Sequence, residues 1–436
     1  MCIRDRYIAH QRFGILPWKK LIEPAIILAR DGFPITDTLA KSLETYKEKL
    51  AKTTDGRKIF FKDGSILKSG EILIQSDLAN TLKLIAQKGP AGFYKGITAQ
   101  KIQLDMRKNG GLISSADLRN YKAKFRTPIR FNYKDLSIVT MPLPSSGGLI
   151  LALMLNMIEQ LELDQTNPHS AENIQKISEI MQIAYSLRSV YMADSDFYDV
   201  PEEEFLSKEK AKDLLENINL KRMSAAEEYD PVKFKFKENT THYSIADSFG
   251  NIVSTTTTLN TAFGSGVVIK DTGLLMNNEM DDFSASPNQP NYFGLLGTYA
   301  NRIEPQKRPL SSMTPTIVFK NDQPYLVTGA QGGSRIITAV LQVILNYYEF
   351  GLSPEESVYK SRYHHQWLPE HLMYESFDEE VIRTLEARGF ILYQRPATYD
   401  FSNGITSSIM FEDEKLIGVS DFRSDDFLSI GVNKNE

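Results

Sequence analysis

The residues from Asn239 to Ser244, NTTHYS, are the clearest candidate for chemistry in this chain of 436 residues. They lead into a β-hairpin pattern, with polar and apolar residues alternating from Tyr243 to Asp247 and a β-branched run from Ile252 to Thr258. A threonine that opens such a strand can be a nucleophile. The alternative is that Thr240 merely starts a strand, because threonine has a high β-propensity.

The chemistry open to Thr240 depends on a nearby base, because a threonine hydroxyl is a weak nucleophile. If the bond between Asn239 and Thr240 is cut, the new α-amino group of Thr240 can be that base, with an ordinary pKa of about 7.7 to 8.0. Nucleophile and base then belong to one residue, so no separate serine, histidine and aspartate set is required. The β-branch of threonine also restricts χ1 and helps to aim the hydroxyl.

The Asn239 segment is the start of the first of four stretches that occur in a fixed order: NTTHYSIADSFGNIVSTTTTLNTAFGSG from Asn239, GLLMNNEMDDFSA from Gly273, KRPLSSMTPTIV from Lys307 and VTGAQGGSRIIT from Val327. In sequence and spacing they resemble the γ-glutamyltransferase (γ-glutamyl transpeptidase) family of N-terminal nucleophile hydrolases. Weaker matches upstream include GFYKG from Gly92 and PLPSSGG from Pro142. The resemblance covers about Phe13 to Ile430 and implies an α+β fold, a four-layer αββα sandwich.

The resemblance also implies a precursor that cuts itself. The Thr240 hydroxyl attacks the Asn239 carbonyl, the acyl group shifts from nitrogen to oxygen, and water hydrolyses the ester. The cut divides the chain into residues 1–239, a helix-rich portion of the large subunit, and residues 240–436, the small subunit that carries the nucleophile. We expect the two to remain one intertwined structural domain.

Two further elements match the family's catalytic residues. Thr258 matches the threonine that holds the nucleophile's hydroxyl, although a β-former in a TTTT run is the simpler reading. Gly332 and Gly333 match the oxyanion-binding pair. Glycines at such turns often serve steric needs alone, but backbone N–H groups before a helix at Ser334 also stabilise an anion.

The donor is a γ-glutamyl group, whose α-ammonium and α-carboxylate need partners of opposite charge or polar groups. The matching residues are Asn260, Glu279 and Asp282 for the ammonium and Ser311 and Ser312 for the carboxylate. The alternatives are ordinary turn carboxylates, or a metal at Asp281 and Asp282. A metal is disfavoured because no third ligand lies at a usable spacing. No cofactor is implied.

The arginine that grips the α-carboxylate in this family belongs to a portion that relatives carry before Phe13. Neither Arg4 nor Arg6 stands in a matching context, so the chain looks N-terminally truncated. Loss of such a charge-assisted partner typically costs about 1.5 to 3 kcal/mol of binding.

The implied activity is hydrolysis and transfer of γ-glutamyl groups from glutathione and related donors to water, an amino acid or a peptide. One alternative is an acylase of the same fold that acts on cephalosporin side chains or poly-γ-glutamate. Another, from a different class, is a binding protein or an inactive fragment that does not process itself. Glu279, Asp282, Ser311 and Ser312 favour a donor with an α-amino acid end.

Composition narrows the classes of partner. A formal net charge of −5 disfavours binding to nucleic acid. The longest apolar runs, such as Gly148 to Met157, are too short for a membrane span. Cys2 is the single cysteine, and the first ten residues contain no apolar segment of a secretory signal. Family members in bacteria are usually exported, so the resemblance alone implies a periplasmic or secreted protein.

The elements around these residues can be predicted from periodicity. Helices are expected at Pro17–Arg30, Ser76–Gln87, Ser170–Met192 and Ser334–Phe350, and a second hairpin at Thr314–Lys320 and Tyr325–Thr328. The stretch from Val200 to Glu238 is expected to be solvated helix and connector.

Other polar and aromatic residues are predicted to lie outside the catalytic set. His364 and His365 are expected in a core or interface, and Ser145 and Ser146 in a turn. The segment from Ser286 to Gly297 resembles the family's lid loop, with Tyr292 and Phe293 as an aromatic gate.

Overall fold

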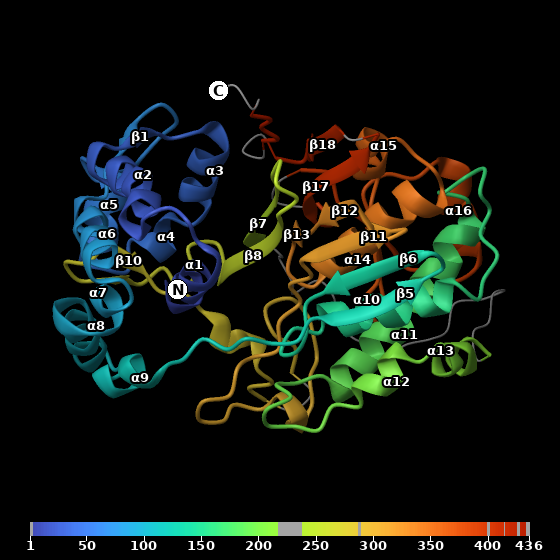
Figure 1. Cartoon of the computed structure of the whole chain (residues 1–436), viewed down its shortest axis with the longest axis horizontal. Helices are drawn as coiled ribbons and strands as arrows, with labels where there is room; N and C mark the ends of the chain where they lie inside the picture. The colour runs from blue at the N-terminus through green and yellow to red at the C-terminus, as the bar shows by residue number, and fades with distance from the viewer. Residues whose placement is uncertain are drawn as a thin grey trace. The chain divides into compact units, whose positions relative to one another are not determined.

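The structure of the chain is a computed structural model that describes residues 3–216, 238–286, 289–398, 402–413, 415–424 and 428–432 (Figure 1). Of the predicted connector, residues 217–237 lie outside the described residues. The chain divides into unit 1, residues 1–126 and 259–278, and unit 2, residues 127–258 and 279–436. Each unit is described by itself.

Unit 1 is built mainly from helices. The helices are α1 (Ile3–Phe13), α2 (Trp18–Asp31), α3 (Asp37–Thr45), α4 (Lys47–Leu50), α5 (Thr54–Phe60), α6 (Ser76–Lys88), α7 (Ala91–Tyr94), α8 (Gly96–Lys108) and α9 (Ser115–Asn120). Short strands pair as β1 (Phe33–Pro34) with β4 (Ile72–Leu73), β2 (Phe61–Lys62) with β3 (Ser65–Ile66), and β9 (Val268–Ile269) with β10 (Leu274–Leu275). Gly32 ends α2 with a φ of 83°, a conformation that favours glycine.

Unit 2 carries the long helices and the main sheet. Its helices are α10 (Gly147–Ile158), α11 (Ala171–Tyr191), α12 (Glu202–Leu206), α13 (Lys208–Leu215), α14 (Arg335–Ile344), α15 (Pro354–Tyr359) and α16 (Glu379–Ala387). Its strands are β5 (Ile129–Tyr133), β6 (Leu136–Thr140), β7 (Glu238–Ala246), β8 (Ile252–Thr261), β11 (Thr316–Lys320), β12 (Gln323–Thr328), β13 (Ala330–Gln331), β14 (Tyr363–His364), β15 (Leu372–Tyr374), β16 (Leu392–Gln394), β17 (Ile405–Glu412) and β18 (Lys415–Ser420). The last residues of β8, from Leu259, belong to unit 1.

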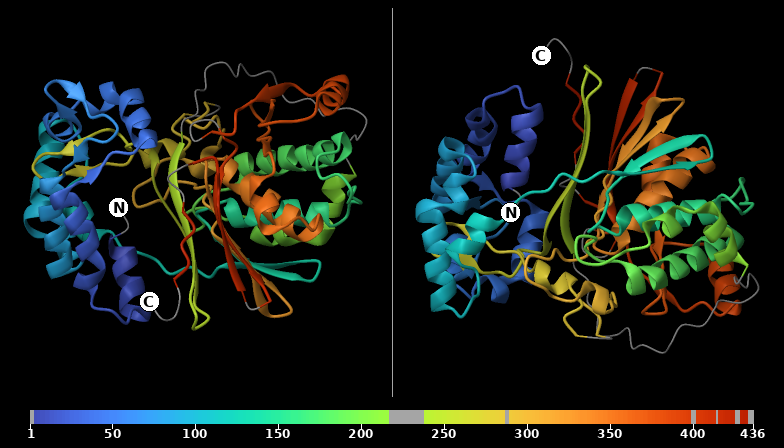
Figure 2. Two further views of the ribbon diagram at one scale, coloured as in Figure 1. Left: turned by 90° about the horizontal axis from the view of Figure 1, so that it is seen from above. Right: turned by 60° about the horizontal axis from the view of Figure 1, so that its bottom comes forward.

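The main sheet of unit 2 has seven antiparallel strands in the order β13-β17-β12-β11-β6-β5, with β18 also paired to β17. Helices α10, α11 and α14 contribute their apolar residues to one core cluster with the strands. The apolar sequence of α10, GGLILALMLNMI, is buried on all sides, as expected of a helix inside a core. Figure 2 shows these helices on one side of the sheet and the β7–β8 hairpin on the other.

The hairpin is fastened to the sheet by polar side chains. Ser244 Oγ of β7 donates to Ser407 O at 2.8 Å, and Ser254 Oγ of β8 donates to Thr328 O at 3.0 Å. Between the strands, His242 Nδ1 lies 2.8 Å from Thr256 Oγ1. Burial lowers the pKa of His242 to about 3, so this imidazole is neutral. These contacts hold the strand that carries Thr240 against β12, β13 and β17.

The predicted α+β class and sandwich type are confirmed, and so are the predicted hairpins and helices. The first hairpin differs at its start, because β7 begins at Glu238 rather than at Thr240. The strand therefore includes Asn239 and Thr240, the two residues on either side of the predicted cleavage site. The last predicted helix also differs: α14 ends at Ile344 and continues as a π-helix, Leu345–Glu349, before Gly351.

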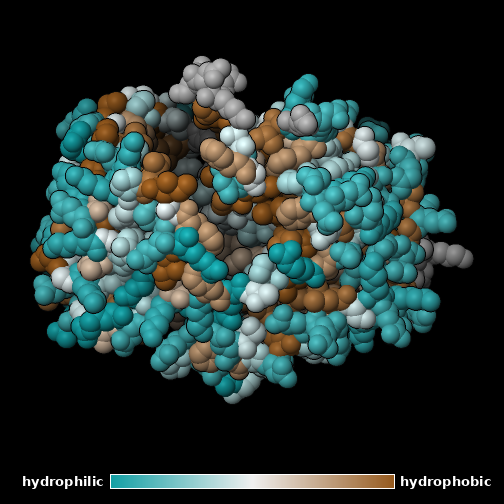
Figure 3. Space-filling model, viewed as in Figure 1, coloured by the Kyte–Doolittle hydropathy of each residue, from teal (hydrophilic) through white to brown (hydrophobic). Residues whose placement is uncertain are grey.

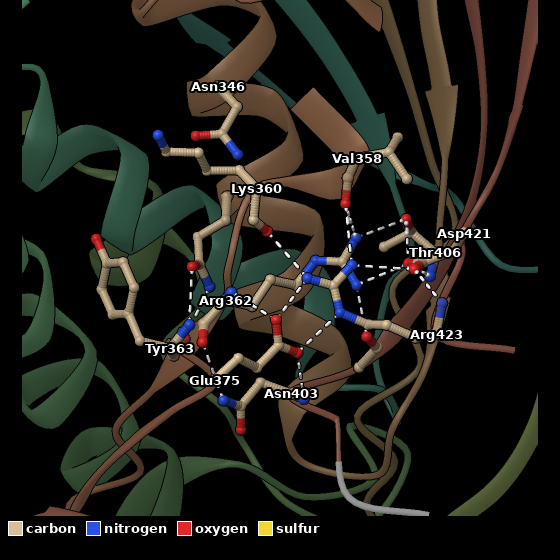
Figure 4. A network of polar contacts seen from close by, with 12 residues as sticks. Asn346, Val358, Lys360, Arg362, Tyr363, Glu375, Asn403, Thr406, Asp421 and Arg423 are labelled. Atoms are coloured by element: carbon tan, nitrogen blue, oxygen red, sulfur yellow. Dashed lines mark hydrogen bonds and ion pairs between the residues drawn. The ribbon is translucent and has the colours of Figure 1, made fainter. Parts of the chain in front are cut away.

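A buried ion network joins the C-terminal strands to α15 and β15 (Figure 4). Arg423 Nε donates to Glu375 Oε1 at 2.8 Å and Arg423 Nη1 to Asp421 Oδ1 at 3.0 Å. Arg362 Nη1 lies 2.8 Å from Asp421 Oδ2. Burial by itself raises the pKa of Asp421, but Arg362 and Arg423 outweigh it and hold this pKa below its usual value. Asp421 is therefore ionised, and each charged side chain of the network has a partner of opposite charge.

The surface is mixed in polarity. In Figure 3 the side that carries α13 and α16 is mostly hydrophilic, in keeping with the charged sequences KEKAKDLL and EEVIRTLEA. Among the described residues, no helix has the length and apolar character needed to cross a membrane.

Candidate active site

The two threonines predicted to act together lie on neighbouring strands. Thr240 Oγ1 of β7 donates a hydrogen bond to Thr258 Oγ1 of β8 at 3.2 Å. Thr240 is 6 % exposed, whereas its neighbour Thr241 is exposed. The alternation of side chains along a strand accounts for this difference, since successive residues point to opposite faces. One hydroxyl is thus held in a defined, largely buried position by another.

The glycine turn follows β13 directly, and β13 lies against β7. Gly333 has a φ of 55°, and a Cβ added there would come within 2.5 Å of the Phe293 ring. Only glycine suits this position, on grounds of both conformation and space. Gly332 also has a positive φ, 142°. The turn leads into α14, so its N–H groups stand at the start of a helix, where an anion is favoured.

Ser311 is held in position by residues 144–146. The sequence predicts a turn for Ser145 and Ser146 but no contact with Ser311. Ser311 N donates to Pro144 O at 2.9 Å, and Ser146 N and Oγ both donate to Ser311 O at 2.9 Å. Ser145 Oγ donates to Met313 O at 2.7 Å. Ser145 and Ser146 are buried. This turn therefore sets the path of the segment that carries both candidate carboxylate-binding serines.

Arg188 of α11 connects this turn to Ser312. Its Nε donates to Ser146 Oγ at 2.8 Å, and its Nη2 donates to Ser312 Oγ at 3.1 Å. A hydroxyl that accepts an N–H bond is left to donate its own proton elsewhere. The Ser146 hydroxyl donates to Ser311 O, and we expect the Ser312 hydroxyl to donate to a ligand.

The acidic residues predicted for the ammonium lie in the 3-10 turn Glu279–Asp282. Burial raises the pKa of Glu279 to about 7. Burial and the neighbouring Glu279 raise the pKa of Asp282 well above its usual value, while Arg188 acts in the opposite direction. A small cavity lies beside Asp282 and Arg188, lined also by Asn291, Leu296 and Leu310. Arg188 thus lies close to Ser312, a predicted carboxylate-binding residue, and to Asp282, a predicted ammonium-binding residue.

Asn260 follows Thr258 in β8 but belongs to unit 1. Its φ is 76°, and its Nδ2 donates to Asn278 O at 3.1 Å. Lys49 Nζ steadies the following residues by donating to Thr261 Oγ1 at 3.1 Å and Ala262 O at 2.8 Å.

The structure also places the remaining candidates. His364 and His365 are buried, as predicted for core histidines. Asp281 Oδ2 accepts from Tyr292 N at 2.8 Å, so this carboxylate anchors the loop of Phe293. Within the part of the chain that the structure describes, no group of three or more histidine, cysteine, aspartate or glutamate side chains could hold a metal ion.

The family model described as Gamma-glutamyltranspeptidase matches residues 3–430. The chain belongs to this family. It is 44% identical to the glutathione hydrolase proenzyme of Escherichia coli (strain K12), covering 97% of this chain and 73% of that protein. It is 36% identical to the glutathione hydrolase proenzyme of Bacillus subtilis (strain 168), covering 98% of this chain and 73% of that protein.

Among solved structures, the chain is similar to a cephalosporin acylase from Bacillus halodurans. The TM-score is 0.84 at 26% identity, covering 97% of this chain and 76% of that one. This γ-glutamyltranspeptidase family member therefore has the fold expected of an N-terminal nucleophile hydrolase, a fold that serves more than one acyl-transfer reaction.

Arg188 of this family member yields a prediction about donor binding. Arg188→Met should raise KM for a γ-glutamyl donor by about ten- to a hundredfold, because a charge-assisted contact behind Ser312 is lost. Arg188→Lys should recover only part of this, since lysine cannot bridge Ser146 and Ser312. Steady-state kinetics on a γ-glutamyl anilide measure both effects. An unchanged KM in Arg188→Met would contradict the role of Arg188 in donor binding.

Proposed function

We propose that the chain hydrolyses and transfers γ-glutamyl groups through an ester on Thr240 Oγ1, after cutting itself between Asn239 and Thr240. The observation that carries this proposal is the 3.2 Å hydrogen bond from Thr240 Oγ1 to Thr258 Oγ1 in a member of this family. Glutathione is the expected donor class, as the names of the relatives indicate.

In the proposed reaction the Thr240 α-amine takes the hydroxyl proton as Oγ1 attacks the γ-carbonyl of the donor. The backbone N–H groups of Gly332 and Gly333 stabilise the tetrahedral oxyanion. The amine then gives its proton to the departing amine of the donor, and a γ-glutamyl ester remains on Thr240. Water or the amine of an amino acid or peptide attacks this ester, and the Thr240 hydroxyl is restored.

Recognition of the donor is proposed to divide between two groups of residues. Within unit 2, Glu279 and Asp282 bind the α-ammonium, while Ser311 and Ser312 bind the α-carboxylate. Asn260, the third residue predicted for the ammonium, belongs to unit 1. Arg188 supports the carboxylate-binding group indirectly, because it donates to Ser312 Oγ.

The two proposed pieces, residues 1–239 and 240–436, share one sheet. Strand β6 of the first piece pairs with β11 of the second from Thr140 opposite Thr316 to Leu136 opposite Lys320. Helices α10 and α11 of the first piece share a core cluster with α14 of the second. We therefore expect the pieces to stay together after cleavage, and we propose a periplasmic or secreted location, as for bacterial members of this family.

A side-by-side assay separates this proposal from its alternatives. A γ-glutamyl anilide should be hydrolysed at least about a hundredfold faster than the glutaryl anilide, because the glutaryl compound lacks the α-ammonium that Glu279 and Asp282 are proposed to bind. Equal or faster use of the glutaryl compound would favour an acylase. Uncut protein with no turnover of either compound would favour an inactive fragment or a binding protein.

The pH dependence should show two separate acid limbs. Because Glu279 has a pKa of about 7, it is largely neutral below that pH and attracts the donor ammonium weakly, so KM should fall as pH rises through about 7. Glu279→Gln should remove this limb. The fall of kcat at low pH should remain in Glu279→Gln, because it reflects protonation of the Thr240 amine. Profiles of kcat and KM measured from pH 5 to 9 would contradict this assignment if Glu279→Gln left the KM profile unchanged.

A further inference from the structure

Gln366, between the buried histidines and β15, has all the hydrogen-bonding capacity of its amide in use. Its Nε2 donates to Phe293 O at 2.9 Å and to Leu368 O at 3.1 Å. Its Oε1 accepts from Ser334 Oγ at 2.7 Å and lies 2.9 Å from His364 Nε2. Two carbonyl oxygens on one side require the NH₂ group there, which fixes the orientation of the amide.

His364 completes this arrangement from the far side. Burial, the largest of several causes, lowers the pKa of His364 well below its ordinary value, so the ring is neutral. Because Gln366 Oε1 can only accept, His364 Nε2 carries the proton, and the unprotonated Nδ1 lies 2.8 Å from Thr338 Oγ1. Gln366, His364 and Ser334 are all buried. The position of Gln366 is therefore tightly determined.

The partners of Gln366 belong to two parts of the candidate site. Ser334 is the residue directly after the Gly332–Gly333 turn, and its carbonyl oxygen also accepts from the Tyr185 hydroxyl. Phe293 belongs to the loop that Asp281 anchors, and its buried ring packs on Gly333. Gln366 is thus bonded to the glycine turn through Oε1 and to the loop through Nε2.

We propose that Gln366 is a positioning residue that fixes the Gly332–Gly333 turn relative to the Phe293 loop. It holds the turn's N–H groups where the oxyanion forms. This inference rests on the proposed function, because it takes the glycine turn to be the oxyanion-binding element. Gln366 touches neither the substrate nor the reacting atoms in this scheme. Its effect on catalysis is exerted through Ser334 and Phe293.

The test is the isosteric substitution Gln366→Glu, which keeps an acceptor for Ser334 and His364 but turns a carboxylate toward the two carbonyl oxygens. A displaced oxyanion site should lower kcat about ten- to a hundredfold while KM changes less than about threefold. Affinity for a boronic acid analogue of the γ-glutamyl donor, which forms a tetrahedral adduct, should fall by the same factor as kcat. The inhibition constant of L-glutamate, a product whose γ-carboxylate is planar rather than tetrahedral, should change by less than about twofold.

Gln342 provides a matched control. It is a buried glutamine whose Nε2 donates to Thr338 O and Tyr363 O, each at 2.8 Å, and whose Oε1 accepts from Tyr363 N at 3.1 Å. None of these partners lies in the glycine turn or the Phe293 loop. Gln342→Glu should lower the melting temperature and leave kcat and boronate affinity of the folded protein unchanged.

Ser334→Ala supplies a second, milder variant that removes only the hydroxyl reaching Gln366. It should lower kcat and boronate affinity in parallel. Its effect should not add to that of Gln366→Glu, because both variants interrupt the same link between the Gly332–Gly333 turn and the Phe293 loop, one at Ser334 and the other at Phe293. If Gln366→Glu fails to fold, the kcat and boronate affinity of Ser334→Ala alone test the proposal. Unchanged kcat and boronate affinity in the folded variants would overturn the proposal, as would equal losses of boronate and L-glutamate binding. Failure of the proposed function would appear separately, as a wild-type protein without γ-glutamyl turnover.

Discussion

Thr240→Ala is expected to stay a single uncut chain and to lose at least about a thousandfold in γ-glutamyl turnover, because it removes the proposed nucleophile of both reactions. Thr240→Ser should retain some processing and activity, since it keeps a hydroxyl and loses only the methyl group that restricts χ1. A denaturing gel reports the cut, and turnover of a γ-glutamyl anilide reports the activity.

The neighbouring Thr241 is the control for this substitution. It has the same side chain on the same strand but is exposed, whereas Thr240 is buried and bonded to Thr258. Thr241→Ala should be cut and active like the unchanged protein. The assignment of Thr240 would be wrong if Thr240→Ala were still cut at the same bond, or if Thr241→Ala behaved as Thr240→Ala is expected to do.

Arg423→Met is expected to destabilise the protein by about 3 to 5 kcal/mol, because it leaves buried carboxylates without their main cation. Glu375 would lose both of its bonds from the Arg423 side chain, and Asp421 would keep its ion pair with Arg362 and its hydrogen bonds from Thr406. Since the folded state holds the pKa of Asp421 below its usual value, the stability that this carboxylate contributes is lost as pH falls. Urea unfolding curves at pH 7 measure the loss.

Arg383→Met of α16 is the matched control, because Arg383 is exposed. Its unfolding midpoint should stay close to that of the unchanged protein. Equal midpoints for Arg423→Met and Arg383→Met would show that the network in Figure 4 contributes little to stability.

The hairpin could be predicted from sequence because its determinants are local. The alternation before Asp247 and the β-branched run to Thr258 specify two strands, and strand pairing then brings Thr240 beside Thr258. The long helices were predictable for the same reason, and Ser170 caps α11 at the expected place by accepting from Asn173 N. Gly333 carried a signal too, since a glycine before a helix indicates a restricted turn.

Arg188 and Gln366 could not be predicted in this way. Arg188 lies on a helix whose pattern indicates only a core face, and Ser312 is more than a hundred residues further on. Gln366 sits in RYHHQW, where no periodicity links it to Phe293 or Ser334. Their contacts arise only when distant elements pack together. A polar residue within an apolar pattern was the available signal. It indicates that the side chain has a hydrogen-bond partner but does not identify that partner.

The intact masses of the two pieces, with the N-terminal residue of the smaller one, test the central claim most directly. The account predicts a piece that begins at Thr240 and ends at Glu436, together with a complementary piece that ends at Asn239. Brief exposure to a γ-glutamyl donor before acid quenching should add the mass of one γ-glutamyl group to the peptide that contains Thr240. A smaller piece that begins at any other residue, or a γ-glutamyl adduct on any other peptide, would contradict the account.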